Sequence, residues 1–382
     1  MTNLLMMNIQ MVDLHSQIAE IREELDAAMS AVLEQGAFVR GPFVAQFEEE
    51  LSAFYHGAYA LGVGNGTDAL QLAYMATGIG AGDEVIVPSF TIFATAEAAA
   101  LLGARPVFVD IDPATFNLDP TLVEAAITEK TKAIVPVHLY GQPADMDPLL
   151  DIAGKHNLIV IEDAAQAIGA KYKGRIVGTL GDVGCLSFYP TKNLGAFGDG
   201  GACITTDDEL AASLRKLANH GAERKYFNTS VGVNSRLDAL QAAILSVKLP
   251  LLNAWTEARR KAADLYDQAL SENELVTIPP RAPYADHVFH QYTIRVPAAA
   301  RDDLAAHLMA CGIPTMVYYP VPLHLLPVFE ELGYAEGALP EAERASREVL
   351  SLPMHPHLLG EQIRYVAETV AAFSYASVSA TL

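Results

Sequence analysis

Lys192 lies in an apolar, glycine-rich run, and this setting makes it the leading candidate nucleophile of the sequence. The run is SFYPTKNLGAFGDGG, residues 187–201, and only one of its side chains is acidic. Burial lowers the pKa of an ammonium group, and a neutral amine can attack a carbonyl carbon to form a Schiff base. A lone lysine is more often structural, so the hypothesis depends on the groups that accompany it.

Asp163 comes directly after the five-residue run LIVIE, residues 158–162, which predicts a strand. Ligands of parallel sheets bind at the carboxyl ends of the strands, so this carboxylate is expected at a ligand-facing edge. A buried carboxylate needs a partner, and the protonated ring nitrogen of a pyridine cofactor would supply one. Gln166 could donate to a second atom of the same ligand. The alternative is an aspartate that caps the next helix.

The segment GVGNGTDAL, residues 62–70, predicts a turn that opens a helix. Its N–H groups and the positive end of the helix dipole can hold a phosphate. Thr67 stands where a dinucleotide-binding fingerprint needs its third glycine, so that interpretation fails. An ordinary glycine turn with a helix cap remains the alternative. The hydroxyl of Ser187 is a second candidate phosphate ligand.

The segment GVNSRLDALQ, residues 232–241, predicts another helix start, because Ser235 and Asp238 have the spacing of a capping box. Asn234 and Arg236 would then lie near a helix end that attracts anions. A cation is unfavourable in the first turn of a helix, and a ligand anion would compensate for it. The four segments together offer a phosphate site, a carboxylate for a ring nitrogen, a Schiff-base lysine and a further anion site. This combination predicts a pyridoxal phosphate site.

The elements around these residues predict an α/β fold. Short β-branched runs alternate with amphipathic stretches from about residue 58 to 205, which indicates a mostly parallel sheet with helices on both faces. The predicted strands are residues 84–88, 105–110, 133–138, 158–162 and 201–205. The predicted helices are residues 16–33, 43–54, 67–77, 120–128, 144–156 and 236–249.

The chain changes character at Pro250, and we predict two domains. Residues 1–250 would form the large cofactor-binding domain with an N-terminal helical segment. Residues 251–382 would form a smaller α+β domain. Within it, the patterns predict a helix over 253–271, a strand over 291–296 and a helix over 301–311.

The composition limits the kinds of partner. Half of the 382 residues are hydrophobic, and a net charge of -21 argues against binding to nucleic acid or to an anionic membrane surface. A phosphate must therefore be bound locally. The three cysteines form no CxxC pair or disulfide framework, and the N-terminus lacks a basic segment followed by an apolar run. We expect a cytoplasmic protein with no metal site and no membrane span.

The motifs NGTDAL, EDAAQ, SFYPTKNLGAFGDGG and GVNSRLDALQAAIL, in this order, resemble the DegT/DnrJ/EryC1/StrS family of sugar aminotransferases. The resemblance runs from VDL at residues 12–14 to SLPMHPH at residues 351–357. It implies a pyridoxal phosphate enzyme of fold type I, the fold of aspartate aminotransferase. It also implies a homodimer, because members of the family share residues between the two active sites.

The resemblance implies a role for each residue of the cofactor site. Lys192 would hold the cofactor covalently and then move the proton. Asp163 would pair with the pyridinium nitrogen, and Gln166 would contact the ring hydroxyl. The residues implied to hold the phosphate are Gly66, Thr67 and Ser187, together with Asn234 from the neighbouring subunit.

Substrate contacts are implied in the same way. Arg236, also from the neighbour, would anchor a substrate carboxylate or another anionic group, since a guanidinium binds a carboxylate through two parallel hydrogen bonds. The runs that contain Tyr189 and His324 are similar to those of enzymes that aminate C-3 of nucleotide-linked 3-keto sugars. Tyr189 and His324 would then contact the sugar near the reacting carbon, although either could simply pack. The amine donor would be L-glutamate, with 2-oxoglutarate as its product.

Several alternatives stay open. They are amination at C-4, a deaminase or dehydratase, and a regulatory member of the family without turnover. Dehydratases of the family carry histidine in place of the lysine, so Lys192 argues against that branch. Ile92 stands where similar members often have an aromatic residue on the cofactor ring, and Phe90 or Phe93 could compensate. A metal-dependent hydrolase built on the histidines at 287, 290, 355 and 357 lacks any supporting HExxH motif.

Overall fold

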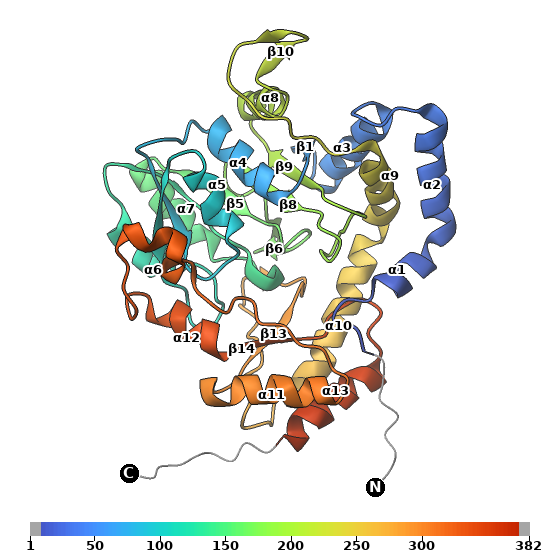
Figure 1. Ribbon diagram of the computed structural model, residues 1–382, viewed down its shortest axis with the longest axis vertical. Coiled ribbons are helices and arrows are strands. Elements are labelled where there is room, and N and C mark those ends of the chain that lie inside the picture. The colour runs from blue at the N-terminus through green and yellow to red at the C-terminus, as the bar shows by residue number, and fades with distance from the viewer. Residues whose placement is uncertain (1–8, 374–382) are drawn as a thin grey trace.

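A seven-stranded sheet with helices on both faces forms the centre of the computed structural model, which describes residues 9–373 (Figure 1). Its strand order is β1-β9-β8-β5-β4-β2-β3. Strands β2, β3, β4, β5 and β8 are parallel, whereas β9 is antiparallel to both of its neighbours. The predicted α/β fold with a mostly parallel sheet is confirmed.

The sheet consists of β1 (Tyr59–Val63), β2 (Glu84–Pro88), β3 (Arg105–Val109), β4 (Thr131–Ile134), β5 (Ile159–Asp163), β8 (Val183–Ser187) and β9 (Gly201–Thr205). Four of the five predicted strands end within one residue of their predicted boundaries, and β4 ends earlier. Strand β8 escaped prediction because VGCLS has a glycine and one β-branched residue. Its pairing with β5 and β9 makes it a strand.

Helices cover both faces of the sheet. The helices of this part of the chain are α1 (Leu14–Glu20), α2 (Arg22–Gln35), α3 (Pro42–Phe54), α4 (Gly66–Ala76), α5 (Ala94–Ala100), α6 (Pro120–Val123), α7 (Met146–His156), α8 (Asp208–Leu217) and α9 (Ala239–Lys248), of which α1 and α2 pack outside α9. The predicted helix 16–33 is interrupted at Ile21, whose backbone leaves the helical region. The predicted helix 120–128 is shorter and ends in the 3-10 turn η1 (Glu124–Ala126).

Two apolar cores lie on opposite faces of the sheet. On one face, α3, α7 and α9 bury side chains such as Phe47, Leu149 and Leu245. On the other, α4 and α8 bury Leu70 and Leu214. Burial on both faces explains why the parallel strands are almost continuously apolar.

A third core belongs to the C-terminal part of the chain. Its main elements are α10 (Leu252–Leu270), β13 (Tyr292–Arg295), α11 (Ala298–Ala310), β14 (Val349–Leu352) and α13 (Gly360–Ala372). Helix α12 (Pro340–Glu348) and the 3-10 turns η4 (Leu323–Leu325) and η5 (Pro327–Leu332) instead pack beside the large sheet. The domain division at residue 250 stays a prediction.

Smaller elements complete the described chain. They are β6 (Lys171–Tyr172), β7 (Arg175–Ile176), β10 (Ala222–Arg224), β11 (Phe227–Asn228), β12 (Ala285–Asp286), η2 (Leu139–Gly141) and η3 (Leu249–Leu251). The hairpin β10–β11 projects from the body as an arm at the top of Figure 1. Between residues 9 and 373, no helix combines the length and the apolar character needed to cross a membrane.

Candidate functional site

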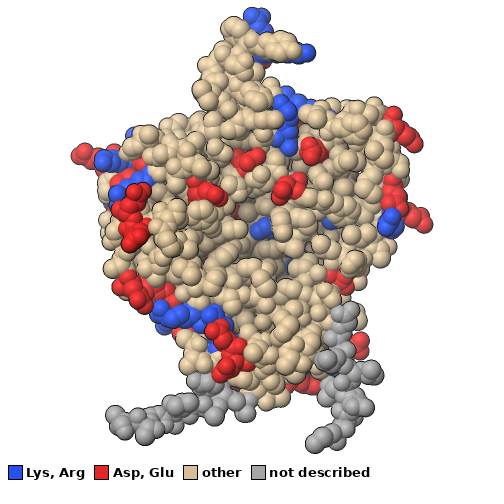
Figure 2. Space-filling model, viewed as in Figure 1, with Lys and Arg blue, Asp and Glu red and all other residues tan. Residues whose placement is uncertain are grey.

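A cavity of about 550 Å³ lies beside the carboxyl ends of the parallel strands. Figure 2 shows the same face hollowed near its centre. The predicted site residues that line the cavity are Gly66, Thr67, Asp163, Gln166, Ser187, Tyr189 and Lys192. They come from segments up to 126 positions apart, and the sheet brings them together.

Lys192 lies in the loop that joins β8 to β9. Asn193 anchors this loop, because its Nδ2 donates to the Val288 carbonyl at 3.1 Å and its Oδ1 lies 3.3 Å from Nδ1 of His290. Burial lowers the pKa of Lys192 to about 8, although the nearby charge of Asp163 opposes the shift. A substantial fraction of this amine is therefore neutral and nucleophilic in mildly alkaline solution.

Asp163 is the last residue of β5, and its buried carboxylate lines the cavity. Thr95 Oγ1 donates to Oδ2 at 2.7 Å, and the Ala165 N–H donates to Oδ1 at 3.2 Å. The alternative that Asp163 caps a following helix is wrong, because the next element along the chain is strand β6. Its two hydrogen bonds fix the orientation of the carboxylate and leave it further acceptor capacity towards the cavity.

The start of α4 and the end of β8 form a cradle for an anion. Asn65 caps the helix, since its Oδ1 accepts the Asp68 N–H at 2.8 Å. The N–H groups of Gly66 and Thr67 in the first turn have no acceptor within the helix. A Cβ atom on Gly66 would lie 2.8 Å from Cβ of Ser187, so only glycine allows the two segments to approach this closely.

Gln166 is held in one orientation. Its Oε1 accepts the Tyr140 N–H at 2.7 Å, and its Nε2 donates to the Tyr319 hydroxyl at 3.1 Å. Tyr319 lines the cavity with Tyr318, His290 and Gln291, and sequence reasoning gave none of these a role in the site. The aromatic pair YYP, residues 318–320, was the signal that could have pointed to two of them.

Ile92 and Thr91 line the cavity at the position where the resemblance implies ring contact. Phe90 packs instead against Phe116, and Phe93 packs against Phe329. Thr91 Oγ1 is buried and, within residues 9–373, has no hydrogen-bond partner. An unsatisfied hydroxyl in a cavity wall is the kind of group that a bound ligand satisfies.

The capping-box prediction for residues 235–238 is wrong. Helix α9 begins only at Ala239, and Ser235 bonds elsewhere: its Oγ donates to Asp68 Oδ2 at 2.6 Å and accepts the Gly64 N–H at 2.9 Å. Arg236 therefore precedes the helix instead of occupying its first turn.

Asn234 and Arg236 do not line the cavity that contains Lys192. Asn234 forms a β-bridge with Asn219, and the Arg236 guanidinium donates to Asn219 Oδ1 at 3.3 Å. Within one chain, the structure thus separates Asn234 and Arg236 from the predicted residues that line the cavity.

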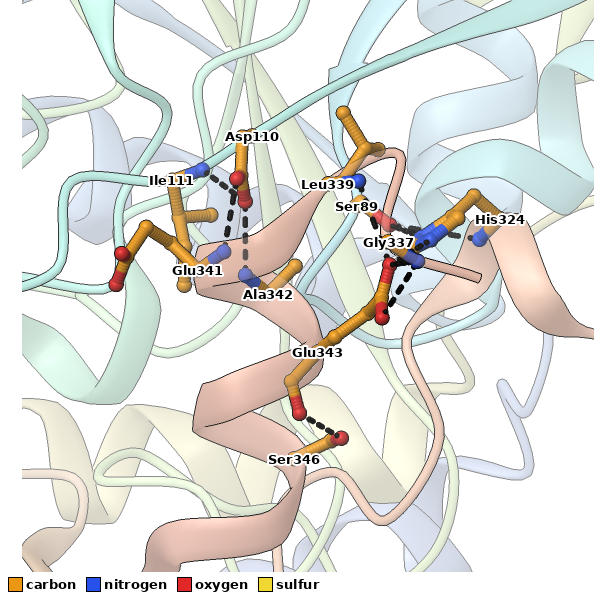
Figure 3. A network of polar contacts seen from close by, with 10 residues as sticks. All are labelled: Ser89, Asp110, Ile111, His324, Gly337, Leu339, Glu341, Ala342, Glu343 and Ser346. Atoms are coloured by element: carbon orange, nitrogen blue, oxygen red, sulfur yellow. Dashed lines mark hydrogen bonds and ion pairs between the residues drawn. The ribbon is translucent and has the colours of Figure 1, made fainter. Parts of the chain in front are cut away.

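The structure does not bring His324 into the cavity, contrary to the sequence prediction. The ring is buried in the network of Figure 3, with Nδ1 2.6 Å from Ser89 Oγ and Nε2 3.2 Å from Glu343 Oε1. The Gly337 N–H also donates to Glu343, shared between Oε1 at 2.7 Å and Oε2 at 2.9 Å. Both ring nitrogens are engaged here, because η4 docks against the chain that follows β2.

The lining of the cavity fits pyridoxal phosphate. The cradle at Gly66 and Ser187 suits a phosphate, and the Asp163 carboxylate suits a protonated ring nitrogen. Lys192 supplies the amine, and Thr91 supplies an unsatisfied hydroxyl. Across the described residues, no group of three or more His, Cys, Asp or Glu side chains is placed to hold a metal ion.

Several known proteins are similar to this chain over most of its length. A protein of Geobacillus stearothermophilus named pleiotropic regulatory protein is 55% identical over 369 residues, which cover 96% of this chain and 99% of that protein. A Pseudomonas aeruginosa protein named UDP-2-acetamido-2-deoxy-3-oxo-D-glucuronate aminotransferase is 48% identical over 362 residues, covering 94% and 98%.

Two solved structures are similar over most of the chain. DesV of S. venezuelae, in complex with a ketimine intermediate, has a TM-score of 0.93 and 47% identity, covering 95% of this chain and 98% of that one. The ntda protein of Bacillus subtilis, described with bound cofactor pmp, has a TM-score of 0.86 and 34% identity, covering 94% and 83%. The predictions of the fold-type I architecture and of the pyridoxal phosphate cofactor are confirmed.

The family model that matches residues 19–371 is that of the DegT/DnrJ/EryC1/StrS aminotransferases. The match spans the sheet, the cavity and the third core. The chain therefore belongs to the DegT/DnrJ/EryC1/StrS aminotransferase family.

Proposed function

We propose that this protein transfers the amino group of L-glutamate to C-3 of a nucleotide-linked 3-keto sugar. The observation that carries the proposal is the single cavity in which the Lys192 amine, the Asp163 carboxylate and the Gly66–Ser187 cradle meet. The 3-oxo sugar in the name of the Pseudomonas aeruginosa relative favours C-3 over C-4.

The side chains of the cavity divide the chemistry between them. Pyridoxal phosphate, when bound, supplies the electron sink. The neutral Lys192 amine would take the proton from the α-carbon of the amino donor and deliver it to the carbon on the other side of the amino nitrogen. Asp163 keeps the ring nitrogen protonated, and Gln166 donates to the ring hydroxyl. The residues that hold the phosphate are Gly66, Thr67 and Ser187. Tyr189, exposed at the cavity mouth, contacts the sugar.

We also propose a cytoplasmic homodimer with shared active sites. Asn234 and Arg236 lie outside the cavity of their own chain, which supports a role for them in the partner's cavity. Tyr226 in the nearby arm and Val231 just after it are each 89% exposed, and they form an apolar surface that a second copy would cover. We propose that Arg224, which lies over the Phe227 ring at 4.8 Å, contacts the nucleotide diphosphate from this arm.

Two half-reactions test the proposal separately. The purified protein is loaded with pyridoxal phosphate, and its visible absorption band is expected to bleach on addition of L-glutamate as 2-oxoglutarate forms. UDP- and dTDP-linked 3-keto sugars are then expected to restore the band and yield the amino sugar, with matched 4-keto sugars as controls. A band that no amino donor bleaches would refute the proposal, and recovery with 4-keto sugars alone would move the reaction to C-4.

The name of the Geobacillus relative supports a second candidate, a regulatory protein. The phenotype of cells that produce Lys192→Ala at normal levels distinguishes the two functions. A regulatory role without turnover predicts an unchanged phenotype, whereas an enzymatic role predicts the phenotype of a deletion.

Replacing Gly66 by alanine is expected to weaken binding of pyridoxal phosphate by about tenfold or more, because the new Cβ would meet Ser187 at 2.8 Å and open the cradle. Fluorescence titration of the cofactor-free protein measures the affinity. Gly154→Ala, in α7 with nothing within 4 Å, is the matched control and should bind normally. Equal affinities for the two variants would contradict the assignment of the cradle.

The reaction of cofactor-free protein with pyridoxal phosphate is expected to follow the titration of Lys192. Only the neutral amine reacts, so the rate should rise about tenfold per pH unit below pH 8 and level off above the lowered pKa of about 8. A lysine with the ordinary value of 10.5 would keep gaining rate beyond pH 9. Stopped-flow absorbance from about pH 6 to pH 10, with Nα-acetyl-lysine as reference, separates the two profiles.

A further inference from the structure

Lys248, in the last turn of α9, is a buried cation that the proposed chemistry does not use. Its side chain is fully buried, and within residues 9–373 no carboxylate pairs with it. Burial lowers the pKa of Lys248 to about 8, and no neighbouring charge opposes the shift. A buried charge is costly unless polar groups compensate it, so the groups that contact this ammonium indicate what it does.

The ammonium contacts the loop that carries Lys192. Lys248 Nζ donates to the Gly195 carbonyl oxygen at 2.6 Å, and it lies 4.7 Å from the centre of the Phe197 ring. Both residues belong to the loop between β8 and β9 and follow Lys192 by three and five positions. A carbonyl oxygen, the face of an aromatic ring and the carboxyl end of a helix all attract a cation. These groups compensate Lys248 in place of a carboxylate.

Gln241 holds the same loop from the same helix. Its Oε1 accepts the Phe197 N–H at 2.7 Å. Gln241 and Lys248 are seven positions apart, which is about two turns of an α-helix, so they project from one face of α9. Leu194 and Ala196 of the loop are buried in the same apolar core as side chains of α9. The loop is thus packed on α9 and fixed to it by one donor and one acceptor.

The loop transmits the position of Gly195 to Lys192. A Cβ atom on Gly195 would lie 2.2 Å from the Pro190 carbonyl oxygen, so the start and the middle of the loop are in contact. The Lys192 N–H donates to the Tyr189 carbonyl at 2.8 Å, which closes the turn that carries the lysine side chain. A shift of Gly195 therefore moves this turn, and with it the Lys192 side chain in the cavity.

We propose that Lys248 is a positioning residue, which acts through Gly195 to hold the Lys192 amine at the reacting carbon atoms. Gln241 supports it through Phe197. Neither Lys248 nor Gln241 lines the cavity, so both act through the loop. A methionine would fill the space of Lys248 at a lower desolvation cost, but it cannot donate to Gly195. The inference rests on the proposed role of Lys192, whereas it does not depend on which keto sugar is the acceptor.

Lys248→Met is expected to slow proton transfer without weakening substrate binding. Rapid mixing of the pyridoxal phosphate-loaded protein with L-glutamate measures both, from the limiting rate of bleaching and the concentration that gives half of it. The limiting rate should fall by about 10- to 100-fold, because a displacement of about 1 Å can cost about 100-fold. The half-saturating concentration should change by less than about threefold. With 2-deuterated L-glutamate the isotope effect should exceed that of the natural protein, because proton transfer then limits the rate.

Hydrogen–deuterium exchange of the loaded protein reports on the loop independently of the reaction. The backbone amides of residues 192–198 should exchange faster in Lys248→Met, and to a smaller extent in Gln241→Leu. Gln241→Leu removes the acceptor of the Phe197 N–H and leaves the buried cation in place. It therefore decides the question if Lys248→Met folds poorly. Unchanged exchange and an unchanged bleaching rate in Gln241→Leu would then overturn the inference.

Ile244→Ala is the matched control for damage to α9. Ile244 lies four positions before Lys248 and belongs to a different apolar cluster, with Leu25 and Trp255, which includes no described residue of the loop. The control variant should melt at a lower temperature, whereas its bleaching rate and loop exchange, measured well below melting, should match those of the natural protein. The inference is overturned if Lys248→Met bleaches at the natural rate, or if Ile244→Ala slows bleaching as much as Lys248→Met does.

Failure of the proposed function gives a different result. If no amino donor bleaches the natural protein but loop exchange still depends on Lys248, the loop contact stands and the proposed reaction does not. If L-glutamate bleaches the natural protein and Lys248→Met equally fast, the reaction stands and the positioning role does not.

Discussion

Lys192→Ala is expected to lower the rate of amino transfer by a factor of about 10³ or more. The side chain is the single amine in the lining of the cavity, and it serves both as the covalent link and as the group that moves the proton. The variant should still bind pyridoxal phosphate through the cradle and Asp163. The substitution is therefore expected to lower mainly kcat. Formation of 2-oxoglutarate from L-glutamate measures the rate.

Two controls accompany this variant. Lys155→Ala removes an exposed lysine that pairs with Glu124 and should retain full activity. Small primary amines added to Lys192→Ala are expected to restore part of the rate, because they can enter the space left by the side chain and carry the proton. Activity of Lys192→Ala within tenfold of the natural protein would rule out the assigned role.

Glu162→Leu is expected to lower the free energy of unfolding by about 3–5 kcal/mol. The Glu162 carboxylate is fully buried, and it accepts hydrogen bonds from His138 Nε2 at 2.9 Å and from the backbone N–H groups of Gly178 at 2.7 Å, Leu180 at 2.6 Å and Gly181 at 2.8 Å. Leucine would leave these buried donors unsatisfied. Urea unfolding followed by circular dichroism measures the loss.

Glu124→Leu is the matched control, because its carboxylate pairs with Lys155 at the surface and contributes at most about 1 kcal/mol. Asp163 is the next residue of β5, so loss of the Glu162 hydrogen bonds is also expected to displace the Asp163 carboxylate in the cavity. Equal stability of the two variants would show that the buried network does not hold the strand.

The contribution of the Glu162 carboxylate to the stability of the fold depends on pH. Burial raises the pKa of Glu162, but the hydrogen bonds from His138, Gly178 and Gly181 outweigh burial and leave it below the ordinary value of 4.5. A group whose pKa is lowered by folding stabilises the fold above its unfolded pKa and loses that effect as the pH falls through its folded pKa. The natural protein should have a higher free energy of unfolding than Glu162→Gln at neutral pH, and this difference should decrease as the pH falls below about 4.5.

The buried network around His324 favours the alternative that this ring packs, and a substrate contact by His324 stays a prediction. The run YPVPLH placed His324 near the cavity by resemblance, and the residue does lie close in sequence to Tyr319, which lines it. The ring direction is decided by Glu343 and Ser89, which lie 19 and 235 positions away. A local motif does not contain that information.

The sequence by itself determined the cofactor chemistry, because the groups that carry it lie in short contiguous motifs. Lys192 in its glycine-rich loop, Asp163 at the end of an apolar strand and Gly66 at the start of a helix each depend on neighbours within a few positions. Periodic apolar patterns likewise located most strands and helices to within one to three residues. These features follow from backbone geometry and local burial.

Only the tertiary structure decided how distant segments meet. Ser235 bonds to Asp68 across 167 positions instead of capping its own helix, and Gln166 is oriented by Tyr319 across 153 positions. Lys248 in α9 donates to Gly195 in the loop of Lys192 across 53 positions, a contact that no spacing rule predicts. Such contacts depend on the order and twist of the strands, so they arise only when the sheet has assembled.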